Sequence, residues 1–245
     1  CLRDELLGRP THDLDFTTDA RPGSIKRLIG DAAPSAIYTV GERFGTIGAI
    51  FGDFVVEITT YRTETYSPDS RKPEVEFGDS LAGDLSRRDF TINALARPAL
   101  GGEVIDLVGG LADLERRVVR AVGDPDERFS EDPLRLLRAV RFCAQLGFAL
   151  DEPTREAVRR QAPMLRIVSR ERVLDELNRL LLTPHPARGL RLLGDLGLAD
   201  EVLPEVAALR QTSQGHRTKD VFEHTLGVVE NTRADLALRW SALLH

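Results

Sequence analysis

Short runs of β-branched and aromatic residues, bounded by glycine or aspartate, recur through about the first hundred residues of the chain. This punctuation is typical of β-strands. Between Arg62 and Asp84 the pattern gives way to polar residues and proline, which predicts a loop much longer than the usual connection of about 4–6 residues. A mixed α/β domain is therefore expected, with strands at Leu14 to Thr17, Ile37 to Val40, Thr46 to Phe51 and Phe54 to Thr60.

The pattern becomes helical after Gly109 and Gly110. Apolar residues then fall at intervals of three and four, as from Leu134 to Ala144, which is the spacing of one helix face. Proline or glycine separates these stretches, and no repeat of fixed period is present. An all-helical second half is predicted, with further helices at Val173 to Leu182, Ala187 to Leu196 and Val221 to Val229.

Composition adds bounds to this picture. At 245 residues and 42% apolar content the chain can bury a sizeable core and is long enough for more than one domain. Its two cysteines, Cys1 and Cys143, belong to no spaced cysteine and histidine cluster, so neither a disulfide framework nor structural zinc is expected. Without a long apolar run or a leader pattern, a membrane span and a secretory signal are not expected, and the cytoplasm is the expected compartment. The oligomeric state is left open.

Charge is distributed unevenly along the chain. The whole sequence has 33 basic and 39 acidic residues, a formal net charge of −6, which argues against nucleic acid as a partner of the molecule as a whole. From Arg116 to Arg191, however, 16 arginines, no lysine and 11 carboxylates give a net positive segment. Arginine suits bidentate contacts to phosphates and base edges. A general preference for arginine over lysine explains the pattern equally well, because the chain has only three lysines.

Three carboxylates in the first half are candidates for metal binding. Asp13 and Asp15 bracket Leu14 in a predicted strand, so alternation places both on one face. Two like charges so close are stabilised by a divalent cation, and oxygen ligands suit Mg²⁺. Alone, this pair is also typical of a solvated strand edge. Glu57, inside the apolar strand from Phe54 to Thr60, is the expected third carboxylate of a two-metal site for nucleotidyl transfer.

Two further motifs carry arginine beside aspartate. In the segment from Arg87 to Ala94, Arg88 could hold a triphosphate and Asp89 a ribose hydroxyl, although a structural Arg–Asp pair at a helix turn is the simpler interpretation. In the segment from Glu131 to Phe142, one helix face is expected to align an acceptor with three donors, which could read a base edge or form ordinary intrahelical ion pairs. These four residues are Asp132, Arg135, Arg138 and Arg141.

The ordered combination of motifs resembles the class II tRNA nucleotidyltransferases, the family of CCA-adding enzymes and bacterial poly(A) polymerases. The resemblance covers about the first 150 residues. It rests on Leu2-Arg3-Asp4, Leu6 to Arg9, Asp13 to Asp15, Arg87 to Ala94, Asp106, Gly109-Gly110, Asp113-Leu114 and Glu131 to Phe142.

The resemblance implies a polymerase-β-like α/β nucleotidyltransferase head followed by all-α neck and body domains and the start of an HD domain. The expected divisions are 1–108, 109–172, 173–215 and 216–245. It also implies CCA addition to tRNA from CTP and ATP with Mg²⁺, and contact between the arginine-bearing helices and the tRNA acceptor arm. The roles that follow are metal binding for Asp13 and Asp15, triphosphate binding for Arg3 and Arg88, ribose binding for Asp89, base pairing for Asp132 and Arg135, and support of that pocket for Arg138 and Arg141.

The sequence also departs from the family pattern. A glycine pair normally precedes the first aspartate by about a dozen residues, and its absence suggests a longer natural protein. The loop from Thr63 to Gly83 matches a segment that CCA-adding members use in switching from C to A. At the far end, His224 and His245 resemble the first ligands of an HD metal site, without the carboxylates that complete it. The alternatives are a poly(A) polymerase or CC-adding enzyme, an HD-type phosphohydrolase, and a non-catalytic RNA-binding protein.

Overall fold

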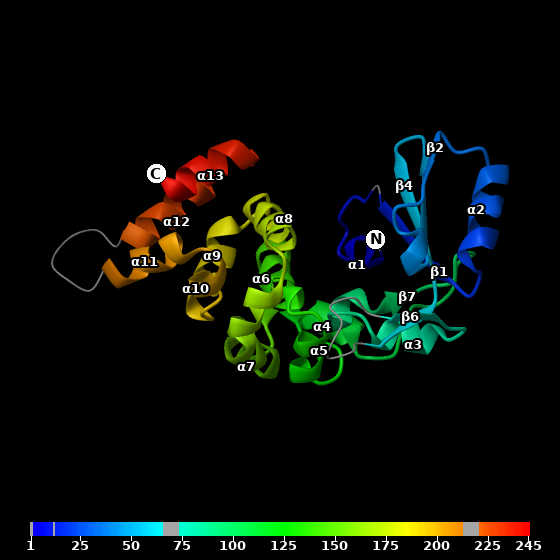
Figure 1. Ribbon diagram of the computed structural model, residues 1–245, viewed down its shortest axis with the longest axis horizontal. Coiled ribbons are helices and arrows are strands. Elements are labelled where there is room, and N and C mark those ends of the chain that lie inside the picture. The colour runs from blue at the N-terminus through cyan, green and yellow to red at the C-terminus, as the bar shows by residue number, and fades with distance from the viewer. Residues whose placement is uncertain (1, 12, 66–73, 213–220) are drawn as a thin grey trace. The chain divides into compact units, whose positions relative to one another are not determined.

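A computed structural model describes residues 2–11, 13–65, 74–212 and 221–245, and the chain divides into two compact units, Cys1–Leu114 and Glu115–His245 (Figure 1). The elements of unit 1 are α1 (Leu2–Leu6), β1 (Asp13–Thr18), α2 (Pro22–Asp31), β2 (Ala36–Tyr38), the 3₁₀ turn η1 (Glu42–Phe44), β3 (Thr46–Phe51), β4 (Phe54–Thr60), β5 (Arg62–Thr65), β6 (Glu74–Phe77), α3 (Leu81–Ser86), the 3₁₀ turn η2 (Thr91–Asn93), β7 (Leu95–Ala96), β8 (Ile105–Asp106) and α4 (Gly110–Arg116), whose last turn passes into unit 2.

A four-stranded sheet in the order β1-β4-β3-β2 forms the centre of unit 1. The pair β1 and β4 is parallel, whereas β4, β3 and β2 are antiparallel neighbours. Helix α2 lies along one face of this sheet (Figure 1) and buries Ile25 and Ile29 against Ile47 and Ala49 of β3. Because strand residues alternate between faces, every second residue of β1, β3 and β4 is directed to the opposite face, away from α2.

The long loop predicted between Arg62 and Asp84 is partly wrong. Its two ends pair as an antiparallel ladder of β5 with β6, and Arg62 lies opposite Phe77. The strands were missed because β5 (RTET) has no apolar residue and β6 (EVEF) alternates glutamate with apolar residues over only four positions. Helix α3 follows, with the Ser80 hydroxyl accepting a hydrogen bond from the Gly83 backbone at its N-terminus. Residues 66–73 of the segment predicted to take part in C-to-A switching lie outside the described residues.

Unit 2 is helical apart from two short paired strands, β9 and β10, which the sequence analysis did not predict. Its elements are β9 (Val118–Val119), α5 (Pro125–Glu131), α6 (Leu134–Leu146), β10 (Ala149–Leu150), α7 (Glu152–Gln161), the 3₁₀ segment η3 (Ala162–Ile167), α8 (Arg170–Leu181), α9 (Pro186–Asp195), α10 (Ala199–Val202), α11 (Pro204–Thr212), α12 (Val221–Asn231) and α13 (Leu236–Leu244).

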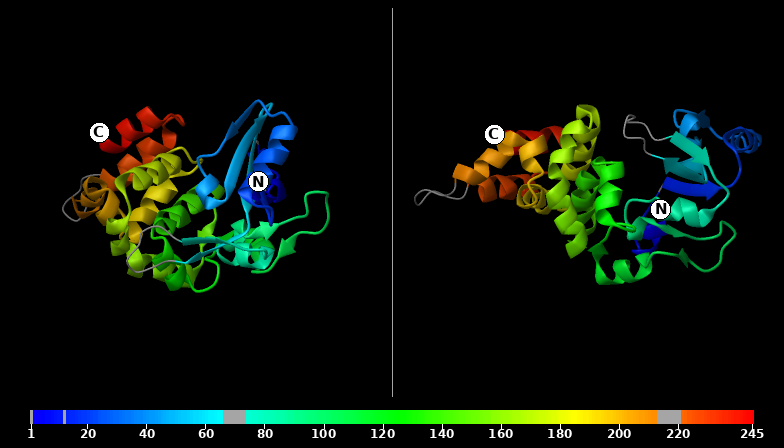
Figure 2. Two further views of the ribbon diagram at one scale, coloured as in Figure 1. Left: turned by 45° about the vertical axis from the view of Figure 1, so that its right-hand side comes forward. Right: turned by 60° about the horizontal axis from the view of Figure 1, so that its bottom comes forward.

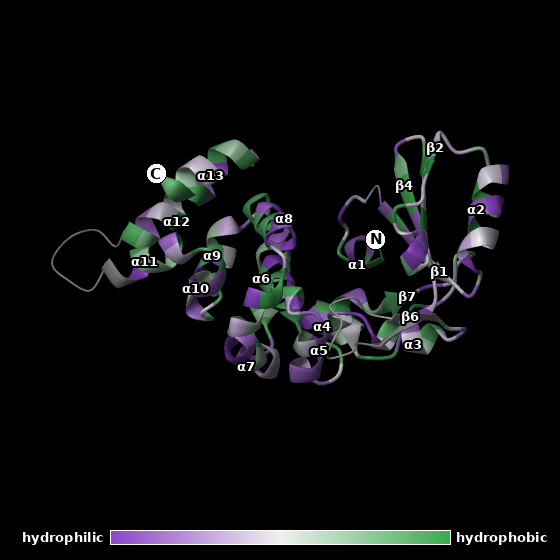
Figure 3. Ribbon diagram, in the orientation of Figure 1, coloured by the Kyte–Doolittle hydropathy of each residue, from purple (hydrophilic) through white to green (hydrophobic). Residues whose placement is uncertain are grey.

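Helix α6 is the central element of unit 2. It packs against both α8 and α9 (Figure 2) and is buried along most of its length, including Leu136, Val140 and Cys143. Burial raises the pKa of the Cys143 thiol to about 12, so this cysteine acts as an apolar packing residue. Gly147 ends the helix with φ of 71°, a left-handed conformation that glycine adopts without a steric cost. Figure 3 shows α6 and α8 carrying hydrophobic and hydrophilic residues together, so charged side chains accompany this core.

The predicted α/β head followed by helices is confirmed by this architecture. Strands β3 and β4 begin and end where the sequence predicts, and the helices expected near 134, 173, 187 and 221 are all present. No helix in the described parts of the chain has the length and apolar character needed to cross a bilayer.

Candidate active site

Three predicted carboxylates share the face of the head sheet that α2 leaves uncovered. Asp13 and Asp15 lie on β1, and the parallel register places Asp15 directly beside Glu57 of β4. All three residues are exposed. Glu57 lies inside the apolar strand β4, but its side of the strand is opposite to the one that packs against α2. Its apolar neighbours Val56 and Ile58 face the helix.

The phenol of Tyr38 joins this acidic group from the far edge of the sheet. Its hydroxyl donates to Glu57 Oε1 at 3.3 Å. Burial raises the pKa of the Tyr38 phenol, and the negative charges of Glu57, Asp13 and Asp15 raise it further. All three carboxylates therefore act on one hydroxyl, which stays protonated and available as a donor at neutral pH.

The donor set fits a hard divalent cation. Asp13, Asp15 and Glu57 offer only oxygen ligands, and they stand on an open face with room for other ligands. Within the described residues no group of three or more His, Cys, Asp or Glu side chains converges closely enough to hold a metal. Asp13, Asp15 and Glu57 would supply part of the shell of such a cation, and water and substrate phosphates would complete it, as is usual for Mg²⁺.

A buried carboxylate holds the two adjacent arginines of the second motif. Asp84 of α3 is only 1% exposed and pairs with Arg87 at 2.6 Å and with Arg88 at 3.2 Å. The hydroxyl of Thr17 donates to the same carboxylate at 3.3 Å. Thr17 lies on β1 two residues after Asp15 and on the same strand face. Asp84 thus connects Arg88 to the strand that carries both metal-binding candidates.

Asn93 connects the remaining candidates of the head. Its side-chain oxygen accepts from Arg3 Nη1 at 2.6 Å, and its amide nitrogen donates to Asp89 Oδ1 at 3.0 Å. Its backbone carbonyl accepts from Arg88 Nη1 at 2.9 Å. The structure therefore brings together Arg3, Arg88 and Asp89, which the sequence predicted separately. Arg3 also pairs with Asp4 at 2.7 Å, so its guanidinium is held from two sides.

In unit 2, the predicted base-pairing residues lie around the junction of α5 and α6. Asp132 stands between the two helices and accepts from Arg172 Nη2 at 2.8 Å. Arg135 is 8% exposed and donates to Glu131 at 2.5 Å and to the Arg128 carbonyl at 2.9 Å. Both predicted template groups are thus held by neighbours of the same unit, and their pairing with a base stays a prediction.

A second buried carboxylate engages the other two arginines of α6. Glu176 of α8 is 4% exposed, and its carboxylate lies 2.6 Å from Arg141 Nε and 3.7 Å from Arg138 Nη1. Burial lowers the pKa of the Arg141 guanidinium, whereas the charge of Glu176 opposes that shift. The guanidinium also lies over the Phe142 ring, with 4.2 Å from its carbon to the ring centroid. Direct contact of Arg138 and Arg141 with a nucleotide stays a prediction.

Five residues that organise these groups had no role predicted from the sequence. They are Tyr38, Asp84, Asn93, Arg172 and Glu176. Asn93 was visible as part of the motif from Arg87 to Ala94, and its position beside Asp89 was the available signal. Asp84 stands three and four positions before Arg87 and Arg88, a helical spacing that was also an available signal. Arg172 and Glu176 lie 35 or more positions from Asp132 and Arg141, so no local spacing marks those contacts. Tyr38 meets Glu57 through strand pairing that the sequence does not give.

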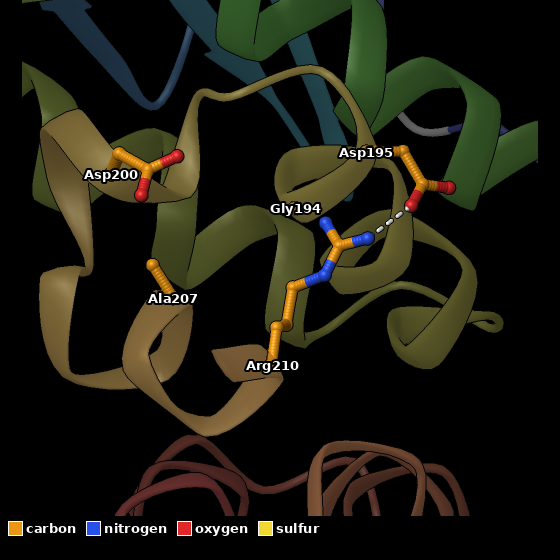
Figure 4. A pocket seen from close by; sticks show the side chains of 5 residues that line it. All are labelled: Gly194, Asp195, Asp200, Ala207 and Arg210. Atoms are coloured by element: carbon orange, nitrogen blue, oxygen red, sulfur yellow. Dashed lines mark hydrogen bonds and ion pairs between the residues drawn. The ribbon is translucent and has the colours of Figure 1, made fainter. Parts of the chain in front are cut away.

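The C-terminal helices show less of the predicted HD character. The rings of His224 and His245 meet edge to face at 6.3 Å between centroids, and the described residues form no metal cluster around them. An HD domain beginning near residue 216 stays a prediction. A hollow of about 310 Å³ elsewhere in unit 2 is lined by Asp195 and Arg210, which are paired at 2.7 Å across it (Figure 4), so we assign it no ligand.

Family models match two parts of the chain. Residues 1–120 match the head domain of poly(A) polymerases, and residues 147–209 match a probable RNA- and SrmB-binding site of polymerase A. A CCA-adding enzyme of Lactobacillus helveticus is 41% identical over 214 residues, covering 87% of this chain and 52% of that protein. One from Geobacillus kaustophilus is 45% identical over 208 residues, covering 84% and 50%. The chain thus spans about half the length of these curated relatives.

Solved structures agree with these matches. The CCA-adding enzyme of Bacillus stearothermophilus in complex with CTP has a TM-score of 0.75 and 37% identity, covering 95% of this chain and 52% of that one. A tRNA nucleotidyltransferase complexed with a primer tRNA and an incoming ATP analogue has a TM-score of 0.70 and 28% identity, covering 93% and 69%. Together with the motifs and the head fold, these similarities show that the chain belongs to the class II tRNA nucleotidyltransferase family, which includes the CCA-adding enzymes.

Proposed function

We propose that the protein adds CMP and AMP from CTP and ATP to the 3′ end of tRNA, building or repairing its CCA terminus. The observation that carries this proposal is that Asp13, Asp15 and Glu57 share the open face of a nucleotidyltransferase head, with Asp15 directly beside Glu57. Relatives named CCA-adding enzymes, and structures of relatives with CTP and with a primer tRNA, support the choice of substrates.

The chemistry assigned to this face is an in-line displacement at the α-phosphorus of a nucleoside triphosphate. Members of the family work with a divalent cation, and we propose Mg²⁺ held by Asp13 and Asp15, with Glu57 as the third carboxylate. When bound, the metal activates the attacking hydroxyl and stabilises the leaving pyrophosphate. Asp13, Asp15 and Glu57 would keep the cation at this position on the sheet. Their exposure leaves access for both the primer end and the triphosphate.

Arginine and asparagine contacts in the head are proposed to orient the incoming nucleotide. Arg3 and Arg88 bind its triphosphate, and Asp89 accepts a hydrogen bond from its ribose. All three side chains hydrogen-bond to Asn93, so the triphosphate and the ribose that they bind would be held in a fixed position relative to each other. Because Asp84 already balances part of the charge of Arg88, the guanidinium is positioned before the nucleotide arrives.

Base choice and RNA binding are proposed for the second unit. Asp132 and Arg135 pair with the base of CTP or ATP, and Arg138 and Arg141 support that pocket and the phosphates. The arginines between 116 and 191 hold the tRNA acceptor arm through its phosphates, so binding should weaken steeply with salt. The division into head (1–108), neck (109–172), body (173–215) and the beginning of an HD domain (216–245), and a cytoplasmic location, belong to the same proposal.

Product length tests the proposal directly. The protein that carries this sequence, at its natural length, is incubated with Mg²⁺ and a tRNA lacking its CCA end, with labelled CTP and ATP supplied separately and then together. Two C residues followed by one A are expected. Failure to extend the tRNA under any of these conditions would contradict nucleotidyl transfer.

A second candidate in the same chemistry is a poly(A) polymerase, which the name of the matching head model favours. The two activities share the sequence motifs on which the family resemblance rests and differ in when addition stops. Long A tails in the same assay would select this candidate, and extension ending after two C residues would select a CC-adding enzyme.

A further inference from the structure

Four residues form one continuous row across the head sheet. The registers place Asp15 of β1 beside Glu57 of β4, Glu57 beside Gly48 of β3, and Gly48 beside Tyr38 of β2. Direct neighbours in such a row share a sheet face. The row therefore runs along the face that α2 leaves uncovered, and it contains two of the three proposed metal-binding carboxylates.

Gly48 is the reason that Tyr38 reaches across the row. A Cβ atom added to Gly48 would lie 2.1 Å from both Cε2 and Cζ of the tyrosine ring, far inside contact distance. The ring thus occupies the space directly above Gly48, and its hydroxyl passes over β3 to meet Glu57 Oε1 at 3.3 Å. Any side chain at position 48 would displace the ring and separate this donor from the carboxylate.

We propose that Tyr38 is a positioning residue of the active site, which holds Glu57 beside Asp15 through its hydroxyl and does so because position 48 is glycine. This inference deepens the proposed function and depends on it. Clustered carboxylates repel one another, and Glu57 has three rotatable bonds on an exposed face. A neutral donor fixed by packing restricts that freedom without competing for the metal, which a lysine or arginine at this place would do.

The hydroxyl of Tyr38 would act by orienting the metal-binding carboxylate of Glu57 and would not touch the reacting atoms. Hydrogen bonds to metal-binding side chains typically change metal affinity or activity about 10–100-fold. The hydroxyl of Tyr38 lies at a partly exposed site, so we expect an effect near the lower end of that range.

The test measures metal binding apart from catalysis. Mn²⁺ is titrated into the natural-length protein without nucleotide, and free Mn²⁺ is followed by electron paramagnetic resonance. Tyr38→Phe removes only the hydroxyl and should weaken Mn²⁺ binding about tenfold. Gly48→Ala moves the ring and should weaken it at least as much. Tyr61→Phe is the matched control, because it removes another phenol of unit 1 outside the row, and it should leave Mn²⁺ binding unchanged.

A second readout separates positioning from general damage. With Tyr38→Phe, the metal concentration for half-maximal CTP incorporation should rise about tenfold while kcat recovers at saturating metal. Unchanged Mn²⁺ binding in this variant would overturn the inference even if Gly48→Ala fails to fold. A fall in kcat that excess metal does not restore would also overturn it. A different result would contradict the proposed function itself: full Mn²⁺ binding and full nucleotide incorporation by the Asp13→Asn variant.

Discussion

The guanidinium of Arg3 donates a hydrogen bond to the side chain of Asn93 at 2.6 Å, although ninety positions separate the two residues. The same asparagine donates to Asp89 and accepts from Arg88 through its backbone. The side-chain amide thus fixes one proposed triphosphate-binding arginine and the proposed ribose-binding carboxylate, and the backbone carbonyl of the same residue holds the second arginine. Because a side-chain amide both donates and accepts, it can join groups of opposite charge in a way that no charged residue could.

Replacing Asn93 with alanine should therefore weaken binding of every nucleotide. Each hydrogen bond to a charged group contributes about 1.5–3 kcal/mol, so we expect KM for CTP and ATP to rise together by about tenfold or more. Steady-state incorporation with each nucleotide measures this. Asn231→Ala, which removes an exposed hydrogen bond to the Gly227 carbonyl, is the control and should leave both KM values unchanged. A rise in KM for only one of the two nucleotides would contradict the proposal that Asn93 orients residues that bind both.

Asp13→Asn separates catalysis from folding. The carboxylate is exposed on the open sheet face, and its loss reduces repulsion with Asp15, so the melting temperature should stay the same or rise slightly. Incorporation should fall by about a thousandfold, because metal stabilisation of the transition state amounts to several kcal/mol. Asp53→Asn, in the exposed turn between β3 and β4, supplies the control. Activity that survives the change at position 13 would remove the metal assignment.

Much of the head fold was predictable because β3 and β4 can be recognised from their own sequences. β3 and β4 alternate apolar residues against α2, and their bounds follow from glycine and aspartate at the ends. β5 and β6 were not predictable in this way, since they form an isolated two-stranded ladder with charged and threonine residues. β5 has no apolar residue and the alternation in β6 covers only four positions, so the sequence marks neither strand strongly.

In the candidate site, too, contacts between residues close in sequence could be predicted, whereas contacts between distant residues could not. Asp13 and Asp15 could be paired from strand alternation alone, whereas Glu57 needed the parallel register of β1 with β4 to become their neighbour. Buried polar partners are harder still to predict. Glu176 lies in a helix whose spacing predicted only an apolar face, and its contact with Arg141 spans 35 positions. A sequence shows that a charge is present but not which distant charge neutralises it.

Arg172 should influence base selection through Asp132. Its guanidinium lies 2.8 Å from Asp132 Oδ2, while Oδ1 accepts from the Leu134 backbone at 3.2 Å, so the carboxylate is held on both sides. Arg172→Ala frees the carboxylate to rotate. We expect misincorporation of UTP and GTP relative to CTP and ATP to rise about tenfold, as is typical for losing one orienting contact to a charged group.

Competition assays with all four nucleotides measure this ratio. Arg159→Ala is the matched control, because Arg159 is a half-exposed arginine of the same unit that pairs with Glu156 at 2.5 Å. If the two variants lose incorporation of every nucleotide equally, Arg172 contributes only positive charge for RNA binding and the link to Asp132 is wrong.

Glu176→Ala should destabilise unit 2 more than any surface substitution of a glutamate. Removing this buried carboxylate leaves the guanidinium of Arg141 buried without its 2.6 Å partner. Breaking a buried pair from one side typically costs about 3–5 kcal/mol. Thermal unfolding should therefore shift down by roughly 6–15 °C for a domain of this size. Glu156→Ala removes an exposed partner and should change the melting temperature by about a degree or less. Equal shifts would show that Glu176 contributes no buried pairing energy.

Asp106 should make the stability of the head depend on pH in the acid range. Burial of its carboxyl opposes ionisation, but backbone N–H groups of Val108, Gly109, Gly110 and Leu111 donate to it and lower its pKa below the ordinary value. A depressed pKa means that the folded state prefers the ionised form. The resulting stability is fully present above the unfolded pKa of about 3.9 and is lost as pH falls through the folded value.

Asp106→Ala removes these hydrogen bonds at the N-terminus of α4 and should lower the free energy of unfolding by about 1–2 kcal/mol at pH 7. Urea titrations at pH 7, 5 and 3.5 measure the difference between the two proteins. Because protonation weakens the native carboxylate contacts, the difference should be the same at pH 7 and 5 and should shrink at pH 3.5. A difference that grows as the solution is acidified would mean that folding raises the pKa of this carboxyl, contrary to the backbone donors that surround it.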